Sequence, residues 1–182
     1  SCAYCFAVPS SMLSSELDEQ LRLTAFAYLR ARQLLTGGPV RYEDAAAFVF
    51  QGQRITLLDP QRGIRKPAVL DAALSFRTVH APRPDLRPYF DEPGRDGYLR
   101  YQYRGVDGQH AENRALRSAM ERRLPLIWFQ GIEQGILLPV YPVWIVGDEP
   151  EQHQFVVALN VEQLAAWDVT DAAERVVLRA YA

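Results

Sequence analysis

Residues 89–104 combine three kinds of chemistry that serve ligand binding. Tyr89 and Phe90 provide aromatic faces, and Asp91 provides a carboxylate that accepts hydrogen bonds. Arg100 and Arg104 follow on one face of a predicted strand, and the planar guanidinium group suits phosphates and base edges better than the point charge of lysine. These groups together indicate a binding surface. The alternative is that the two rings anchor their loop in the core and that the acid makes a surface turn.

Other cationic and polar side chains add to the candidates. Arg65 and Lys66 lie in a predicted loop that starts with a glycine, where they could grip phosphates. The alternative is that they are solvated surface charges. His110 and Asn113 fall in the first turns of a predicted helix, where free backbone N–H groups favour an anion. For Asn113 we prefer a second interpretation, in which it faces inward and holds a backbone carbonyl of the sheet.

The sequence offers little for catalysis or metal binding. Asp107, His110 and Asn113 could be offered as polar catalysts, but no Ser or Cys nucleophile with a matching base is recognisable. Cys2 and Cys5 form a C-x-x-C pair, and a zinc site would need two more ligands, which the three histidines do not supply at ligand spacing. We therefore expect no catalytic residue, no metal and no cofactor.

The composition indicates one globular domain. The chain has 182 residues, of which 48% are hydrophobic and 23% are charged, a mixture that excludes a disordered chain, a collagen-like repeat and a coiled coil. No apolar run reaches the roughly 18 to 20 residues that a membrane-spanning helix needs, and the start lacks the pattern of a secretory signal. We expect a cytoplasmic protein with no membrane contact.

The formal net charge of -2 hides a division within the chain. Residues 54–123 carry 13 Arg and Lys66 against 9 acidic residues, a net charge of +5, whereas the remaining residues carry -7. One surface of an acidic protein could therefore be basic. Of the 20 basic residues, 19 are arginine. A GC-rich genome would also favour arginine codons, but it would not explain the segregation.

Apolar spacing predicts the elements that would position these residues. Leu17, Leu21, Leu29 and Leu34 recur at intervals typical of an amphipathic helix over 17–35, which a Gly-Gly-Pro would end. The segments that follow are a helical turn at 43–47, a hairpin of 48–50 and 54–58, an exposed basic loop at 63–67, a strand at 73–79 and a long irregular segment at 80–97. A stretch of that length with so little periodicity is usually a binding loop or disordered.

The clearest pattern is a strand at 98–105. Leu99, Tyr101 and Tyr103 alternate with polar residues, which gives the strand an apolar side and a basic side. Asp107 could cap the helix that follows, which runs to about residue 123. Strands at 125–132, 136–146 and 155–159 and a terminal helix at 170–181 complete the chain. These elements predict an α+β fold with a strongly curved sheet or partly closed barrel and flanking helices.

Three stretches resemble the core of the SRA-type domains of the PUA-like superfamily. They read D-G-Y-L-R-Y-Q-Y-R-G at 96–105, N-R-A-L and a later small residue at 113–119, and L-P-L-I-W-F-Q-G at 124–131. SRA-type domains carry, in this order and at similar spacing, a D-G, a strand ending in Y-T-G, a helix with N-x-A-L and a proline-led strand ending in R-G. More closely, the chain from Leu21 onward, through Y-P-V-W-I-V-G-D at 141–148, resembles the N-terminal region of bacterial HNH-type restriction endonucleases.

The resemblance implies a pocket for an extruded base. SRA-type readers rotate one cytosine out of the duplex and stack it on aromatic rings. A carboxylate of the pocket accepts a hydrogen bond from the exocyclic amine of the base. The matching residues here are Tyr89, Tyr103 and either Asp91 or Glu92, of which we choose Asp91. Arg104 replaces the threonine of the family pattern.

Further contacts follow from the same resemblance. Trp128 and Tyr141 are candidates for the wall of the pocket, although aromatic residues within apolar strands more often belong to the core. The cations expected at the DNA backbone or base edges are Arg65, Lys66, Arg100, Arg104, His110 and Arg117.

The resemblance also implies an organisation and a function. It implies a flexible terminus at 1–15, an SRA-like DNA-reader domain at 16–168 and a linker helix at 169–182 toward an HNH nuclease domain that is absent from this sequence. The chain would not itself be an enzyme. It would bind double-stranded DNA carrying 5-methyl- or 5-hydroxymethylcytosine by base flipping, as the specificity part of a modification-dependent restriction endonuclease that could act as a homodimer. The alternatives are a PUA-like RNA-binding module, a reader of phosphorothioate backbone, and an enzyme acting on a small substrate.

Overall fold

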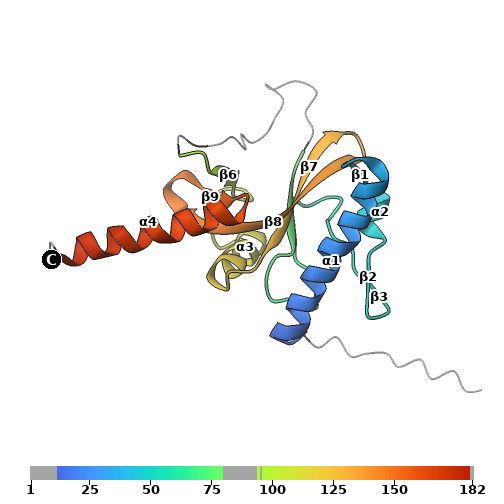
Figure 1. The fold of residues 1–182 in the computed structure, drawn as a ribbon, viewed down its shortest axis with the longest axis horizontal. Helices are drawn as coiled ribbons and strands as arrows, with labels where there is room; N and C mark the ends of the chain where they lie inside the picture. The colour runs from blue at the N-terminus through green and yellow to red at the C-terminus, as the bar shows by residue number, and fades with distance from the viewer. Residues whose placement is uncertain (1–11, 80–93, 95, 181–182) are drawn as a thin grey trace, which may run out of the picture.

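Helices flank a curled sheet in the computed structural model, which describes residues 12–79, 94 and 96–180 (Figure 1). The elements are α1 (Ser15–Thr36), β1 (Val40–Arg41), α2 (Tyr42–Ala46), β2 (Val49–Phe50), β3 (Gln53–Arg54), β4 (Ile64–Arg65), β5 (Ser75–Thr78), β6 (Leu99–Gln102), α3 (Ala111–Glu121), β7 (Leu126–Glu133), β8 (Ile136–Glu149), the 3₁₀ helix η2 (Pro150–Gln152), β9 (Gln154–Ala158) and α4 (Val161–Ala180). No helix of the described residues has both the length and the apolarity to cross a membrane.

The main sheet has the strand order β4-β5-β7-β8-β9-β6, and β1 pairs with the first part of β8. Only the β5–β7 pair is parallel; the other described pairs in this sheet are antiparallel. The sheet curls through about 206° into a half-barrel. The predicted α+β fold with a strongly curved sheet and flanking helices is therefore confirmed.

The 14-residue strand β8 holds the two halves of this sheet together. Its residues up to Val143 pair with β7 and those from Trp144 onward pair with β9, and a register shift at Ile145/Gly147 lies within the part paired with β9. Such irregularities increase local twist and bend a strand. Gly147 also leaves room for α4, because a Cβ atom there would lie 3.0 Å from the Trp167 ring.

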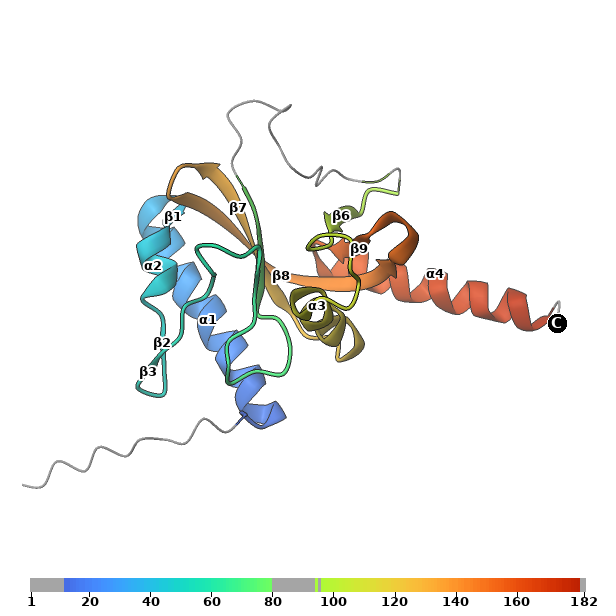
Figure 2. The same cartoon turned by 180° about the vertical axis from the view of Figure 1, so that it is seen from behind.

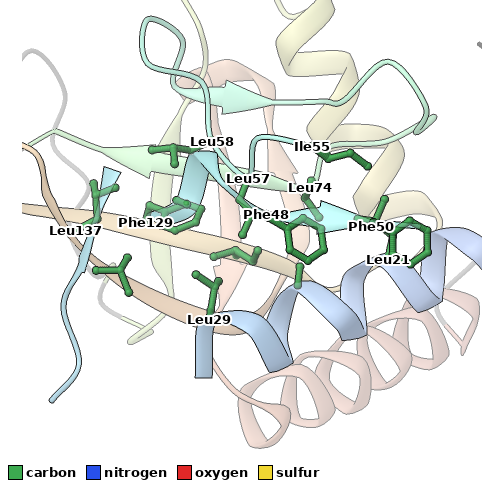
Figure 3. Close-up of a cluster of buried hydrophobic side chains, with 14 of the residues drawn as sticks. Leu21, Leu29, Phe48, Phe50, Ile55, Leu57, Leu58, Leu74, Phe129 and Leu137 are labelled. Atoms are coloured by element: carbon green, nitrogen blue, oxygen red, sulfur yellow. The ribbon is translucent and has the colours of Figure 1, made fainter. Parts of the chain in front are cut away.

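Two hydrophobic clusters lie on opposite faces of the sheet. The α1 cluster contains Leu21, Ala25 and Leu29 of α1 and extends to the residues labelled in Figure 3. The α3 cluster contains Leu116 and Ala119 of α3 together with residues of β4 to β9. Strand β7 serves both clusters by alternation, since Ile127 and Phe129 enter the α1 cluster while Leu126 and Trp128 face the α3 cluster.

A buried ion pair fastens α1 to the sheet. Arg22 is 0% exposed, and its Nε donates to Asp18 Oδ1 at 2.5 Å one turn earlier. Its Nη1 donates to the carbonyls of Ala73 and Pro125, at 2.9 and 2.8 Å, which lead into β5 and β7. Burial lowers the pKa of Arg22, and the bond to Asp18 partly offsets this. One charged side chain thereby joins three segments far apart in the sequence.

The open side of the half-barrel is closed by Tyr101. Strands β4 and β6 are the two ends of the sheet order, yet the Tyr101 ring of β6 packs on Phe76 of β5 with ring centroids 4.7 Å apart. The Tyr101 hydroxyl donates to the carbonyl of Arg77 at 3.3 Å. Gly63 makes room for this contact, because a Cβ atom at residue 63 would lie only 2.8 Å from the hydroxyl oxygen.

Three expectations about local structure were wrong. The terminal helix begins at Val161 rather than at residue 170, because Asn160 Oδ1 accepts from Gln163 N and so caps the helix, while Gln163 Oε1 accepts from Leu159 N, the residue before the cap. The helix that precedes β7 is capped by His110 rather than Asp107. The segment at 63–67 is not a fully exposed loop, since Ile64 is buried in β4 and pairs with Phe76.

We predict that Asp18→Ala lowers the free energy of unfolding by about 3–5 kcal/mol, because it leaves a buried guanidinium without its carboxylate. Urea denaturation of the purified protein measures this loss. The exposed neighbour provides the control, and Glu19→Ala should change stability by no more than about 0.5 kcal/mol. Equal stability of the two variants would contradict the structural role of the pair.

We predict that Gly63→Ala destabilises the protein by about 1–3 kcal/mol, because the new methyl group meets the Tyr101 hydroxyl. The same change should lower the free energy of unfolding clearly less in a Tyr101→Phe background, because the clashing hydroxyl oxygen is absent. Denaturation of the two single variants and the double variant measures the coupling. An additive result would show that the contact does not close the half-barrel.

Candidate functional site

The loop after β6 is held to α3 by one buried amide. Asn113 is 0% exposed, its Nδ2 donates to the carbonyls of Arg104 and Asp107 at 3.1 and 2.8 Å, and its Oδ1 accepts from Arg104 N at 2.7 Å. The expected inward, structural role of Asn113 is confirmed, although the carbonyls belong to the loop rather than to a strand. Residues 103–110 are thereby fixed beside the start of α3.

A tyrosine, an aspartate and an arginine form a linked cluster next to this loop. The Tyr103 hydroxyl donates to Asp148 Oδ1, and Arg117 Nε donates to Asp148 Oδ2 at 2.8 Å. Arg117 Nη1 reaches the carbonyl of Gly108 at 3.0 Å. Burial, followed by Asp148, raises the pKa of Tyr103. Burial lowers the pKa of Arg117, but its bonds to the cluster outweigh this, so the net shift is upward.

The cluster places Tyr103 in the core. Tyr103 is 3% exposed. Its ring centroid lies 4.8 Å from that of Phe155 and 6.0 Å from that of His153, which packs edge to face. The structure therefore gives Tyr103 a role in orienting Asp148 and Arg117. Its predicted role as a stacking ring for a base stays a prediction.

The cations predicted for DNA contacts differ in how firmly they are held. Asp96 and Glu149 both bind Arg100, at 2.9 and 2.7 Å, and these bonds raise the pKa of Arg100 and lower the pKa of Asp96. Arg104 is half exposed, with its Nη1 3.1 Å from the buried Glu112 carboxylate. His110 caps α3 by accepting from Glu112 N.

Arg65 and Lys66 lie apart from this group, on and after β4. Arg65 Nε donates to the carbonyl of Thr56 at 3.0 Å, and partial burial lowers its pKa. Lys66 is exposed and its ammonium donates to the carbonyl of Leu70 at 3.0 Å. The structure thus places Arg104, His110 and Arg117 around the loop after β6 and on α3, whereas Arg100 pairs with Glu149 on the other face of β6 and Arg65 and Lys66 lie on and after β4.

The predicted pocket aromatics do not share one face of the sheet. Trp128 packs on Phe76 beside the α3 cluster, and its buried indole N–H has no hydrogen-bond partner among the described residues. Tyr141 lies against the α1 cluster, where its ring stacks on Phe26 and its hydroxyl donates to Gln33 Oε1 at 2.5 Å. Tyr141 is therefore not brought together with Tyr103 and Trp128.

Several predicted residues lie outside the described part of the chain. These are Tyr89, Asp91 and Glu92 of the pocket, and Cys2 and Cys5. Among residues 12–79, 94 and 96–180, no three side chains of His, Cys, Asp or Glu gather as a metal site would require.

A hollow of about 610 Å³ lies beside Gly131 of β7. Its lining comes from the end of β5, the β7–β8 turn, the start of α2 and the loop before β4: Tyr42, Pro60, Arg77, Thr78, Val79, Gly131, Glu133, Gln134, Gly135 and Leu137. Arg77 follows Phe76 along β5, so it faces away from the α3 cluster. Pockets for small ligands have volumes of roughly 300–1,000 Å³.

Four separate segments build this hollow, so no single stretch of the sequence predicts it. Arg77 was assigned only to a strand, Tyr42 to no element, and Glu133 to a turn. One signal was available: a glycine inside a strand often marks the close approach of a ligand or of other backbone, and Gly131 is such a residue.

Comparison of the chain with protein-family models, curated proteins and solved structures found no match.

We predict that Tyr103→Phe lowers stability near pH 8 by about 0.5–1.5 kcal/mol, because it removes the bond to Asp148. The folded-state pKa of Tyr103 lies above its unfolded value of about 10, so its contribution is complete below that pH and is lost as the pH rises through the folded pKa. The variant should therefore lose less stability than the wild type above about pH 10. Urea denaturation across this range tests it, and parallel curves for the two proteins would contradict it.

Proposed function

We propose that this chain is a DNA-binding module that recognises a modified cytosine, 5-methyl- or 5-hydroxymethylcytosine, by extruding it from the duplex. The module would serve as the specificity part of a modification-dependent HNH restriction endonuclease in the cytoplasm. It would supply no catalytic residue, and the pairing of two copies would occur in the complete protein. The extrusion of a base costs a few kcal/mol, which contacts in a pocket must offset.

One observation carries the proposal: the motif stretches of the SRA-like pattern fold into one connected unit. Gly97 of the D-G has φ +83, and Tyr98 N donates to Asp96 Oδ1, so the pair makes a turn into β6. Asn113 of the N-x-A-L stretch then binds the backbone around Arg104, directly after Tyr103. Asp96, Gly97 and Asn113 of the motif stretches thus each stabilise the backbone before or after β6.

The surface beside this unit supports a polyanionic partner. Arg104, His110 and Arg114 are exposed at the end of β6 and on α3. Arg100 and Arg117 are neutralised by carboxylates and Arg104 is paired with Glu112, so Arg114, which is exposed and forms no ion pair with a described residue, is the best candidate for backbone contacts.

We predict that the protein binds a duplex with one 5-methylcytosine or 5-hydroxymethylcytosine more tightly than the unmodified duplex, with affinity that falls steeply with salt. Fluorescence anisotropy with these duplexes, phosphorothioate DNA and single-stranded and duplex RNA measures the preference. The highest affinity for RNA or for phosphorothioate DNA would overturn the proposal, as would equal affinity for all duplexes.

The variant Arg114→Gln tests the exposed basic surface. A change at Arg104 would instead remove the ion-pair partner of the buried Glu112 carboxylate. We expect the slope of log K against log salt to fall by about 1, with weaker binding to every duplex. Arg30→Gln removes an equally exposed arginine on α1 and is the matched control. The same slope for both variants would contradict the assigned surface.

A further inference from the structure

The hollow beside Gly131 combines the kinds of group that an extruded cytosine requires. Tyr42 is the aromatic residue of its lining, Glu133 provides a carboxylate and Arg77 a guanidinium. Cytosine offers an amine donor together with acceptor atoms on its pairing edge, so a carboxylate and a guanidinium are complementary to it. We propose that this hollow receives the extruded modified base, in place of the predicted pocket at Tyr103 and Trp128, which belong to the α3 cluster on the other face of the sheet. The inference rests on the proposed function and assigns its pocket.

The bonding of Arg77 points to a ligand. Its Nη2 donates to the carbonyl of Pro60 at 2.7 Å, which holds the side chain at the hollow, and no described carboxylate lies within ion-pair distance of it. Arg100 and Arg117 are also partly buried, but each is paired with a carboxylate. The charge of Arg77 therefore remains available for acceptor atoms of a base or for a phosphate.

Glu133 is the complementary acceptor. It is exposed at the end of β7, where Cα pairing sets it opposite Ile136 across the β7–β8 turn, and it forms no ion pair with a described residue. Its carboxylate can accept from an exocyclic amine without giving up an existing salt bridge. A guanidinium and a carboxylate on the same wall distinguish this hollow from a purely apolar groove.

The apolar lining explains a preference for the methylated base. Pro60, Val79 and Leu137 line the hollow, and Val79 is 61% exposed although its side chain is apolar. Coverage of one additional methyl group by such side chains corresponds to about a fourfold gain in affinity. The hollow thus provides contacts for the ring, for its polar edge and for the modification.

Two exposed arginines flank the hollow. Arg41 directly precedes Tyr42, and Arg62 follows Pro60 by two residues. Arg62 belongs to the basic segment of the chain, which gives that segment a second group of cations besides those on β6 and α3.

Binding of a duplex with one 5-methylcytosine, with 2-aminopurine as its neighbour, tests the assignment. Anisotropy reports affinity, and the fluorescence of 2-aminopurine rises when the adjacent base leaves the stack. We expect Tyr42→Ala to weaken binding of the modified duplex by roughly 5- to 150-fold, the effect of a lost stacking partner. Tyr42→Phe, which keeps the ring, should bind like the wild type.

Glu133→Ala provides an independent test at an exposed residue, where the fold is not at risk. This variant should bind the modified duplex about tenfold more weakly and bind the unmodified duplex as the wild type does, because only an extruded base reaches the carboxylate. Glu151→Ala, an exposed glutamate of η2, is the matched control and should match the wild type. Circular dichroism melting checks that each variant is folded.

The outcomes separate this inference from the proposed function. Weaker modified-duplex binding and loss of the 2-aminopurine signal in Tyr42→Ala and Glu133→Ala support the hollow as the pocket. Wild-type affinity and signal in both variants, with the wild type still preferring modified DNA, would overturn the hollow and leave the proposed function intact. A wild type without preference or signal would overturn both.

Discussion

The half-barrel depends on a side-chain contact across its open side, between β6 at one end of the strand order and β5 next to the other end. Strands β5 and β6 share no backbone ladder, and the Tyr101 ring on Phe76 with its hydroxyl on the Arg77 carbonyl links them instead. Gly63 allows this approach. Because Arg77 carries both the accepting carbonyl and a side chain that lines the hollow on the other face, this contact also fixes one wall of the candidate pocket.

The second constraint is electrostatic. Arg22 places a full charge in the interior, where it is tolerable only with its carboxylate and two carbonyls in position. These partners come from the same helix and from the chain entering β5 and β7. The helix α1 can therefore sit on the sheet in one register, on the side away from α3 (Figure 2).

Periodicity in the sequence was sufficient to predict most elements and the curled sheet. The alternation of Leu99, Tyr101 and Tyr103 against polar residues holds in the structure, where all three are buried. It could not predict which arginines form ion pairs, because Arg100 pairs with Glu149 and Arg117 pairs with Asp148, and both acids lie on β8, far along the chain from the arginines. Nor could it predict a hollow whose walls come from four segments. The early start of α4 was predictable in principle, since Asn160 is of a residue type that often caps helices.

The long strand β8 has a consequence for how the chain folds. It pairs with β7 before it and β9 after it, and both connections are short, so this meander needs little loop closure. The parallel β5–β7 pair and the β6–β9 pair join segments much farther apart along the chain. Low contact order favours early formation. We therefore expect the meander around β8 to form early and the closure of the half-barrel by β6 to follow it.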